Sequence, residues 1–367
     1  MKASRSLKVV AAVAASALSI SGISMLAVNP ASAAARTTVV IVESNAMTSL
    51  NSSTPETNVT VNSDIAYVQG AGFNYYDDKK NLIQNKVFGS YKIVKNTAKD
   101  FRVQYTVAKG RVWSDGTPIT GVDLLLSHVL VSNKYSIAAG LGDPANTDAT
   151  PAFNSVGYGG PYSTHVVGAP TLSADGQSVT IQYDSFQPDW EVMGPGPSPV
   201  HALVEMAQGK DSLQSASANL AAKAAFLKAF KSKDTALLKK IGKIWSNDYN
   251  IKTVNSNTNE LLLVTNGGYQ VKSAVADQSA TLVANPKYNS GKKLSGIKTI
   301  VFKFIADGTA ASQALANHEI DVYQGQPTAD AVAQLKGLSG VTTIGGTNAC
   351  FEHIDLRVGD GQGETDK

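Results

Sequence analysis

Residues 106–130 read TVAKGRVWSDGTPITGVDLLLSHVL, and this stretch decides the fold. It begins at the end of the run 101–107, in which apolar and polar residues alternate as in a strand with one buried face. Ser114–Pro118 is a turn sequence. Thr120 can cap a helix over 121–131, whose apolar face holds Val122, Leu125, Leu126 and Val129. The stretch therefore predicts a strand, a turn and a helix in succession.

The chain on either side predicts further elements. Thr37–Glu43 is a short β-branched run and indicates the first strand, Lys92–Val94 indicates a strand that pairs with 101–107, and 170–184 indicates a hairpin. Helices are predicted over 64–73 and, in two pieces broken near 232–234, over 213–245.

The last third of the chain alternates strands with helices. Strands are predicted at 269–276, 279–284, 297–304 and 321–323, and helices at 309–317 and 329–335. Such alternation favours a parallel α/β sheet.

The first 33 residues have the pattern of a cleaved export signal. Lys2, Arg5 and Lys8 precede the uncharged apolar run 9–28, and small residues at Ala31 and Ala33 predict cleavage after Ala33. A membrane anchor is the alternative, because the run is nearly long enough to span a bilayer. Serines within the run and the cleavage pattern directly after it favour the signal.

Charge and cysteine content limit which classes of function and which kind of membrane attachment the sequence supports. Removing residues 1–33 leaves 29 Lys+Arg against 29 Asp+Glu, so the exported chain is formally neutral and lacks the basic footprint of a nucleic-acid binder. Cys350 is the single cysteine, so no internal disulfide forms and no lipid can be attached at the cleavage point. We therefore expect an exported protein without a lipid anchor.

Sequence motifs of catalysis are missing. The chain has no G-x-S-x-G, no phosphate-binding lysine loop, no G-x-G-x-x-G after a strand and no H-E-x-x-H. The five histidines, at 128, 165, 201, 318 and 353, do not have metal-ligand spacing. We expect no enzyme, no metal and no cofactor; a secreted enzyme with a dispersed site is the alternative.

The stretch 106–130 closely resembles the hallmark segment of the extracytoplasmic solute-binding proteins of peptide, nickel and related ABC importers, family 5. The matching residues are Lys109, Trp113, Ser114, Asp115, Gly116, Thr117, Pro118, Thr120, Asp123 and Ser127. Five more blocks resemble the family in the same order, at 75–82 (YYDDKKNL), 199–201 (PVH), 267–271 (GGYQV), 285–288 (NPKY) and 314–322 (ALANHEIDV).

The resemblance implies an α/β fold of the two-lobe periplasmic-binding-protein type, class II, with an extra subdomain. It divides the chain into a signal peptide (1–33), the core of lobe I (34–62 and 170–270), a subdomain inserted in lobe I (63–169) and the start of lobe II (271–367). It also implies that the chain is truncated at its C-terminus and that lobe II is incomplete, because the family continues well past the strand expected at 351–356.

The resemblance also implies where residues act. Trp113, Asp115, Gly116 and Asp123 are expected to be structural, with the Trp113 indole seeking an acceptor. Ligand contacts are expected from the loop after the first strand, since α/β sheets place ligands at the carboxyl ends of strands, and from two other places. A plain loop or core role is the alternative for each of these residues: Glu43, Ser44, Asn45 and Met47; Tyr158, Gly159 and Gly160; Trp190.

The function implied is capture of short peptides outside the membrane by a monomer that delivers them to an ABC permease and its ATPase. Alternative ligands for the same scaffold are a nickel chelate, an opine, a sugar or a signalling peptide. The lysines between 223 and 243 indicate either a solvated helix face, the preferred interpretation, or a membrane-surface helix.

Overall fold

A computed structural model describes residues 36–146, 148–294, 296–325 and 328–345, and the described residues from Thr37 onward form one compact unit. The predicted signal peptide, Cys350 and the predicted strand at 351–356 lie outside the described residues. No helix in the described ranges is long and apolar enough to cross a membrane.

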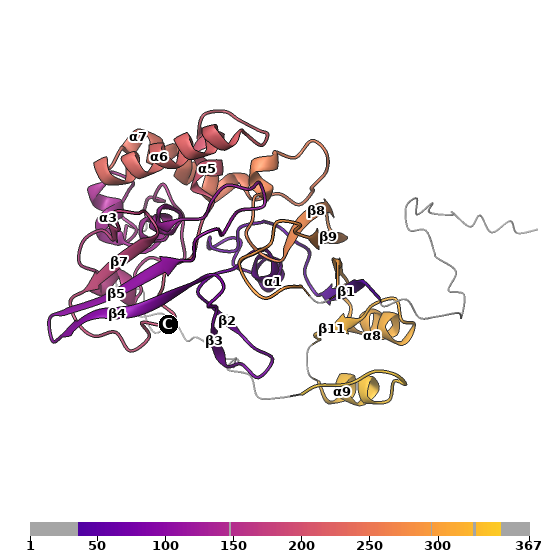
Figure 1. Ribbon diagram of the computed structural model, residues 1–367. Coiled ribbons are helices and arrows are strands. Elements are labelled where there is room, and N and C mark those ends of the chain that lie inside the picture. The colour runs from indigo at the N-terminus through magenta and orange to yellow at the C-terminus, as the bar shows by residue number, and fades with distance from the viewer. Residues whose placement is uncertain (1–35, 147, 295, 326–327, 346–367) are drawn as a thin grey trace, which may run out of the picture. The chain divides into compact units, whose positions relative to one another are not determined.

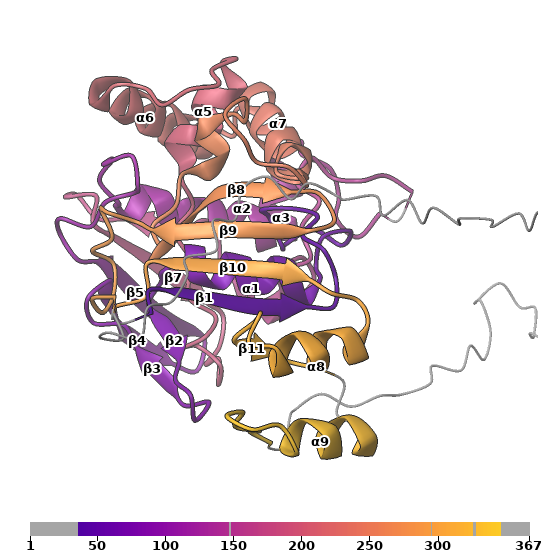
Figure 2. The ribbon, with the colours of Figure 1, turned by 90° about the vertical axis from the view of Figure 1, so that its right-hand side faces the viewer.

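A five-stranded sheet has the strand order β11-β1-β10-β9-β8 (Figures 1 and 2). Its strands are β1 (Thr38–Glu43), β8 (Tyr269–Val275), β9 (Ser279–Ala284), β10 (Thr299–Phe304) and β11 (Val322–Tyr323). The prediction of a parallel sheet is only partly right: β1 runs parallel to β10 and β11, but β8, β9 and β10 are antiparallel. The connection from β8 to β9 is short enough for a hairpin, whereas parallel neighbours need a crossover, which α8 (Gly308–Ala316) provides between β10 and β11.

Alternation along β1 gives this sheet two apolar faces. Val39 and Ile41 belong to the core that includes Val61 and Ile65 of α1 (Thr60–Gln69). Val40 and Val42 belong to a smaller core under α8. Helix α1 begins four residues before the predicted start, and α9 (Ala329–Lys336) follows β11 as predicted.

A second, antiparallel sheet has the order β4-β5-β7-β6. Its strands are β4 (Gly89–Thr97), β5 (Asp100–Val107), β6 (Thr171–Leu172) and β7 (Ser178–Tyr183), which confirms the predicted strand pair and the predicted hairpin. Burial alternates along β5 as the sequence predicts. A separate hairpin joins β2 (Asn74–Tyr76) and β3 (Leu82–Gln84).

Helices pack with this second sheet in one large core. They are η1 (Gly121–Leu124), α2 (Leu125–Val131), α3 (Asn133–Ala138), α4 (Pro161–His165), α5 (Val200–Ala207), α6 (Ala216–Ser232), α7 (Thr235–Lys243), the π-helix η2 (Ile244–Asp248) and η3 (Glu260–Leu263). Thr120 and Asp123 form a capping box at the start of η1, so the predicted cap is confirmed. The predicted break falls at Lys233, which is left-handed with φ 54°, and Asp234 caps α7.

Strand pairing crosses two predicted domain boundaries, and the domain division itself stays a prediction. The partners of β1 are β10 and β11, which come from the segment assigned to lobe II, so pairing crosses the predicted boundary at 271. Strand β5 pairs with β7 across the predicted boundary at 170, and both contribute to one core. The physical reason is the same in both places. A strand joins the sheet whose strands satisfy its backbone hydrogen bonds, even when those strands are far away in sequence.

A buried ion pair ties α6 to the turn before η1. The Lys223 ammonium lies 2.6 Å from the Asp123 carboxylate, and their side chains are 6% and 0% exposed. Lys223 also donates to the carbonyl of Pro118. Breaking such a pair by removing one partner leaves the other charge buried without compensation.

We expect Lys223→Met to lower the free energy of unfolding by about 3 kcal/mol, measured by urea denaturation. Lys228→Met, an exposed position on the same helix, is the matched control and should change stability by less than about 0.5 kcal/mol. Equal effects of the two substitutions would show that the pair contributes nothing.

Candidate functional site

Two adjoining cavities lie at the carboxyl-terminal end of α1. The inner cavity is about 190 Å³ and the outer cavity about 570 Å³. Ala66, Gly70, Pro197 and Asn266 border both of them. The outer volume is within the range of roughly 300–1,000 Å³ that small-ligand sites usually have.

The wall between the cavities is fixed by close backbone contacts. Asn266 clamps Ala71, accepting from its N–H (3.1 Å) and donating to its carbonyl (2.8 Å). Gly267 donates its N–H to the carbonyl of Gln69 at 2.7 Å, and Thr265 donates its hydroxyl to the same oxygen. A Cβ at position 267 would lie 2.2 Å from the carbonyl carbon of Gln69, so only glycine allows this approach.

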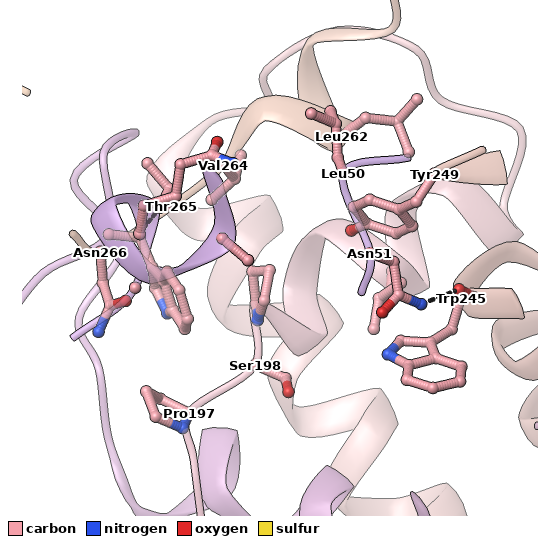
Figure 3. Close-up of a pocket in the computed structure, with 16 residues that line it drawn as sticks. Leu50, Asn51, Pro197, Ser198, Trp245, Tyr249, Leu262, Val264, Thr265 and Asn266 are labelled. Carbon is pink, nitrogen blue, oxygen red and sulfur yellow. Dashed lines mark hydrogen bonds between the residues drawn. The ribbon is translucent and has the colours of Figure 1, made fainter. Parts of the chain in front are cut away.

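The inner cavity is lined by chain segments that are far apart in sequence (Figure 3). Leu50 and Asn51 come from the loop after β1, and Pro197 and Ser198 from the segment before α5. Trp245 lies in η2 and Tyr249 directly follows it, while Leu262, Val264, Thr265 and Asn266 come from η3 and the approach to β8. Asn51 is held in place because its amide donates to the carbonyl of Trp245 at 2.7 Å.

Five side-chain donors that line the inner cavity have no partner among the described residues. They are the amide of Gln69, the indole N–H groups of Trp113 and Trp245, and the hydroxyls of Ser198 and Tyr249. The indole nitrogen of Trp113 is buried from solvent and from the cavity, so its unpartnered N–H has a cost in stability. The expected acceptor for this indole is therefore not found in the described chain.

The outer cavity is rich in tyrosine and carries one cation. Its aromatic lining is Tyr67, Tyr75, Tyr76, Tyr269 and Tyr288. The Lys292 ammonium lies 5.7 Å from the ring centre of Tyr75, a cation–π distance. The hydroxyls of Tyr75 and Tyr288 make no hydrogen bond within the described ranges, and burial raises the pKa of Tyr288, so it stays a neutral donor.

Neither cavity is lined by a described acidic residue, and the described chain contains no cluster of His, Cys, Asp or Glu able to hold a metal ion. Neutral donors and a single ammonium suit a ligand that offers acceptors and a negative charge. The geometry does not suit a bare cation.

The predicted ligand residues after β1 lie elsewhere. Glu43, Asn45 and Met47 border a hollow of only about 10 Å³, and Ser44 is exposed beside it. Met47 is 7% exposed and belongs to the core under the first sheet. Burial and the neighbouring Asp64 carboxyl raise the pKa of Glu43 to about 7, and the two carboxyls share a hydrogen bond.

The other predicted ligand residues also lie outside both cavities. Tyr158 donates its hydroxyl to the carbonyl of Val129 at 2.9 Å, Gly159 has φ +79°, and Gly160 begins α4. Trp190 packs on the large core, and its carbonyl accepts from Tyr105 at 2.9 Å. Gly160, the N-cap of α4, also lines a third cavity of about 370 Å³, and a ligand role for these residues stays a prediction.

The predicted structural residues lie where they were expected. Asp115 accepts from the backbone N–H of Thr117 at 2.9 Å and from the His201 imidazole at 2.8 Å. Gly116 has φ +100°, a backbone conformation that favours glycine. Asp123 caps η1 and pairs with Lys223.

Sequence reasoning missed the residues that line the cavities. Asn266 and Thr265 directly precede the block 267–271, and Tyr75 and Tyr288 lie inside the blocks 75–82 and 285–288, but none of these four residues was predicted to contact a ligand. A polar residue next to a strand start gives no sequence signal of which side it faces. Burial of Trp113 without an acceptor could not be read from the sequence either.

Comparisons with known proteins bear on this arrangement. The family model described as "Bacterial extracellular solute-binding proteins, family 5 Middle" matches residues 92–361. A comparison with curated proteins gives no match.

Solved structures share the fold at low sequence identity. The periplasmic EDTA-binding protein EppA has a TM-score of 0.56 and 21% identity, over 82% of this chain and 46% of that protein. The oligopeptide-binding protein AppA from Bacillus subtilis, in complex with a nonapeptide, gives 0.52 and 16%, over 82% and 46%. The oligopeptide-binding protein from Thermus thermophilus, with a pentapeptide, gives 0.51 and 15%, over 82% and 48%.

The chain thus spans about half the length of these solved proteins, whose shares covered are 46%, 46% and 48%. At these identities the likeness concerns the fold, which is the two-lobe periplasmic-binding-protein type that the sequence predicted.

The Glu43–Asp64 pair makes stability depend on pH. The pKa of Glu43 rises from 4.5 to about 7 on folding, so the protonated form contributes stability that is fully present below 4.5 and lost as the pH rises through about 7. We expect the free energy of unfolding to fall between pH 5 and pH 8 and Glu43→Gln to remove most of that fall, as measured by urea denaturation across this range.

Glu191→Gln, at an exposed glutamate outside the pair, is the matched control and should leave the pH dependence unchanged. An unaltered pH dependence in Glu43→Gln would contradict the assignment.

Proposed function

The chain belongs to the bacterial extracellular solute-binding proteins, family 5, and on that premise we propose that it binds a short peptide outside the membrane for delivery to an ABC permease and its ATPase. In this proposal residues 1–33 direct export without a lipid anchor, and the protein works as a monomer without catalysis. The ligand lies in the two cavities at the end of α1, and a second lobe closes over it.

The observation that carries the proposal is the set of unpartnered donors in the inner cavity. A peptide offers carbonyl acceptors along its backbone, and the hydroxyls of Ser198 and Tyr249 and the indole N–H of Trp245, which line the inner cavity, are donors that can match them. Since these contacts do not depend on ligand side chains, they suit recognition of peptides of varied sequence.

The outer cavity supports the same ligand class. Lys292 and the free hydroxyls of Tyr75 and Tyr288 can receive a carboxylate, such as the C-terminus of a peptide. The ligand residues predicted from sequence, Glu43 to Met47, Tyr158 to Gly160 and Trp190, do not line these cavities, so the proposed contacts move to the residues that do.

A polycarboxylate metal chelate is the second candidate ligand. Lys292 is the one charged residue that lines the described cavities, and an anionic chelate would use it equally well. EppA, which has this fold, binds EDTA.

Native mass spectrometry of protein purified without denaturation tests the function. A mixture of bound peptides supports the proposal, whereas a single metal chelate would replace the peptide with the second candidate. Hydrolysis of esters or peptides from a broad panel would overturn the binding role and indicate an enzyme.

We expect Lys292→Gln to weaken binding of a short peptide about fivefold, because an exposed charge pair contributes on the order of 1 kcal/mol. Isothermal titration with peptides recovered from the protein measures this. The neighbouring Lys293→Gln is the matched control, since Lys293 is equally exposed and lines neither cavity. The loss should disappear for the same peptide with an amidated C-terminus. A loss that persists with the amide would show that Lys292 does not receive a carboxylate.

A further inference from the structure

The outer surface of α6 and α7 is strongly basic. Between Ala216 and Lys243 the sequence has seven lysines, no arginine and one acid, Asp234. Lys223 is buried in its pair with Asp123, and the remaining six are exposed. We call these six the lysine face: Lys228, Lys231, Lys233, Lys239, Lys240 and Lys243.

The helix geometry puts these side chains on one side of each helix. On α6 the buried residues are Ala222, Phe226, Ala229 and Phe230, and at about 100° per residue Lys228 and Lys231 project from the opposite side. On α7 the buried side holds Leu238 and Ile241. Its three lysines, Lys239, Lys240 and Lys243, project from the opposite side in the same way. Figures 1 and 2 both place α5, α6 and α7 together at one end of the unit.

The charges of the lysine face are not paired within the described chain, although the charge of Lys243 acts on the carboxyl of Asp248. None of its six ammonium groups forms an ion pair with a described acid. The carboxylate of Asp234 is occupied as the cap of α7, where it accepts from the N–H groups of Ala236 and Leu237. The exported chain as a whole is formally neutral, so this concentration of charge is local.

We propose that the lysine face binds the anionic lipid surface of a membrane. Clusters of four to eight basic residues are attracted to anionic headgroups by about 1 kcal/mol for each charge near the surface. Lysine is a compact, strongly hydrated charge that needs no fixed geometry, whereas arginine is preferred for bidentate recognition and protein interfaces. The lysine face holds six such charges, which favours a lipid surface over an acidic protein partner.

Binding through this face would be peripheral. The buried residues of both helices, such as Phe226 and Ile241, are not available to enter the bilayer, and Leu220 is the large apolar side chain that α6 exposes, at 53%. None of the six lysines lines either cavity, so a chain adsorbed in this way keeps both open to ligand. The interaction should weaken strongly with salt, because exposed charges are screened within about 8 Å at physiological ionic strength.

The test is cosedimentation of the exported form, starting at Ala34, with vesicles of phosphatidylcholine containing phosphatidylglycerol. The triple variant Lys228→Gln, Lys231→Gln, Lys240→Gln should bind about 100-fold more weakly, the loss expected from three charges. The matched control Lys86→Gln, Lys92→Gln, Lys99→Gln removes the same charge from exposed positions on and around β4, and it should bind as the unsubstituted chain does.

Circular dichroism and peptide titration should be unchanged in both triple variants, which separates this surface from the ligand site. Equal losses in the two variants would show that only net charge matters and would overturn the proposal. So would equal binding to pure phosphatidylcholine vesicles, or no binding at low salt. Capture of an acidic protein instead, abolished by the triple variant of the lysine face, would assign the face to a protein partner.

Discussion

Hydrogen bonds from the turn at 110–118 join the two sheets, and both cavities depend on this joint. Ser114 donates its N–H to the carbonyl of Thr265 at 2.7 Å, and its hydroxyl accepts from the N–H of Thr265 at 3.1 Å. On the other side, Asn289 accepts from the N–H of Val112 at 3.2 Å and donates to the carbonyl of Gly110 at 2.8 Å. Because Thr265 also contacts Gln69, the same joint sets the distance from the turn to the end of α1.

Buried polar side chains form hydrogen bonds with Asp115 and hold the turn at 110–118 in place. Burial alone would raise the pKa of Asp115, but the hydrogen bond and charge of His201 and the amide of Thr117 hold it below its ordinary value. Asn219 adds a further donor at 3.0 Å. The network is incomplete, because both carboxyl oxygens of Glu205 lack a described partner, and burial raises the pKa of Glu205. Such a network fixes one geometry at a cost in stability, which suits a joint more than a plain core.

Local sequence patterns predicted the individual helices and strands better than they predicted which strands pair in a sheet. The alternation of Phe101 to Val107, the cap at Thr120 and the break at Lys233 depend on neighbours in sequence, and each was found where expected. The pairing of β1 with β10 depends on backbone groups more than 250 residues apart, and no local pattern encodes it. The same limit applies to the site. No local pattern shows that the indole N–H of Trp113 lacks an acceptor, or that Asn266 forms a hydrogen bond with Ala71, because both depend on residues distant in sequence.

The residues that line the inner cavity come from separate segments of the chain, the first at Leu50 and the last at Asn266. Contacts between such distant segments form late in folding, because closing a long loop costs entropy before any contact is gained. A chain still being synthesised has no such cavity until the segment around Asn266 has emerged and docked on α1. The inner cavity is therefore a property of the folded chain and does not exist on the growing polypeptide.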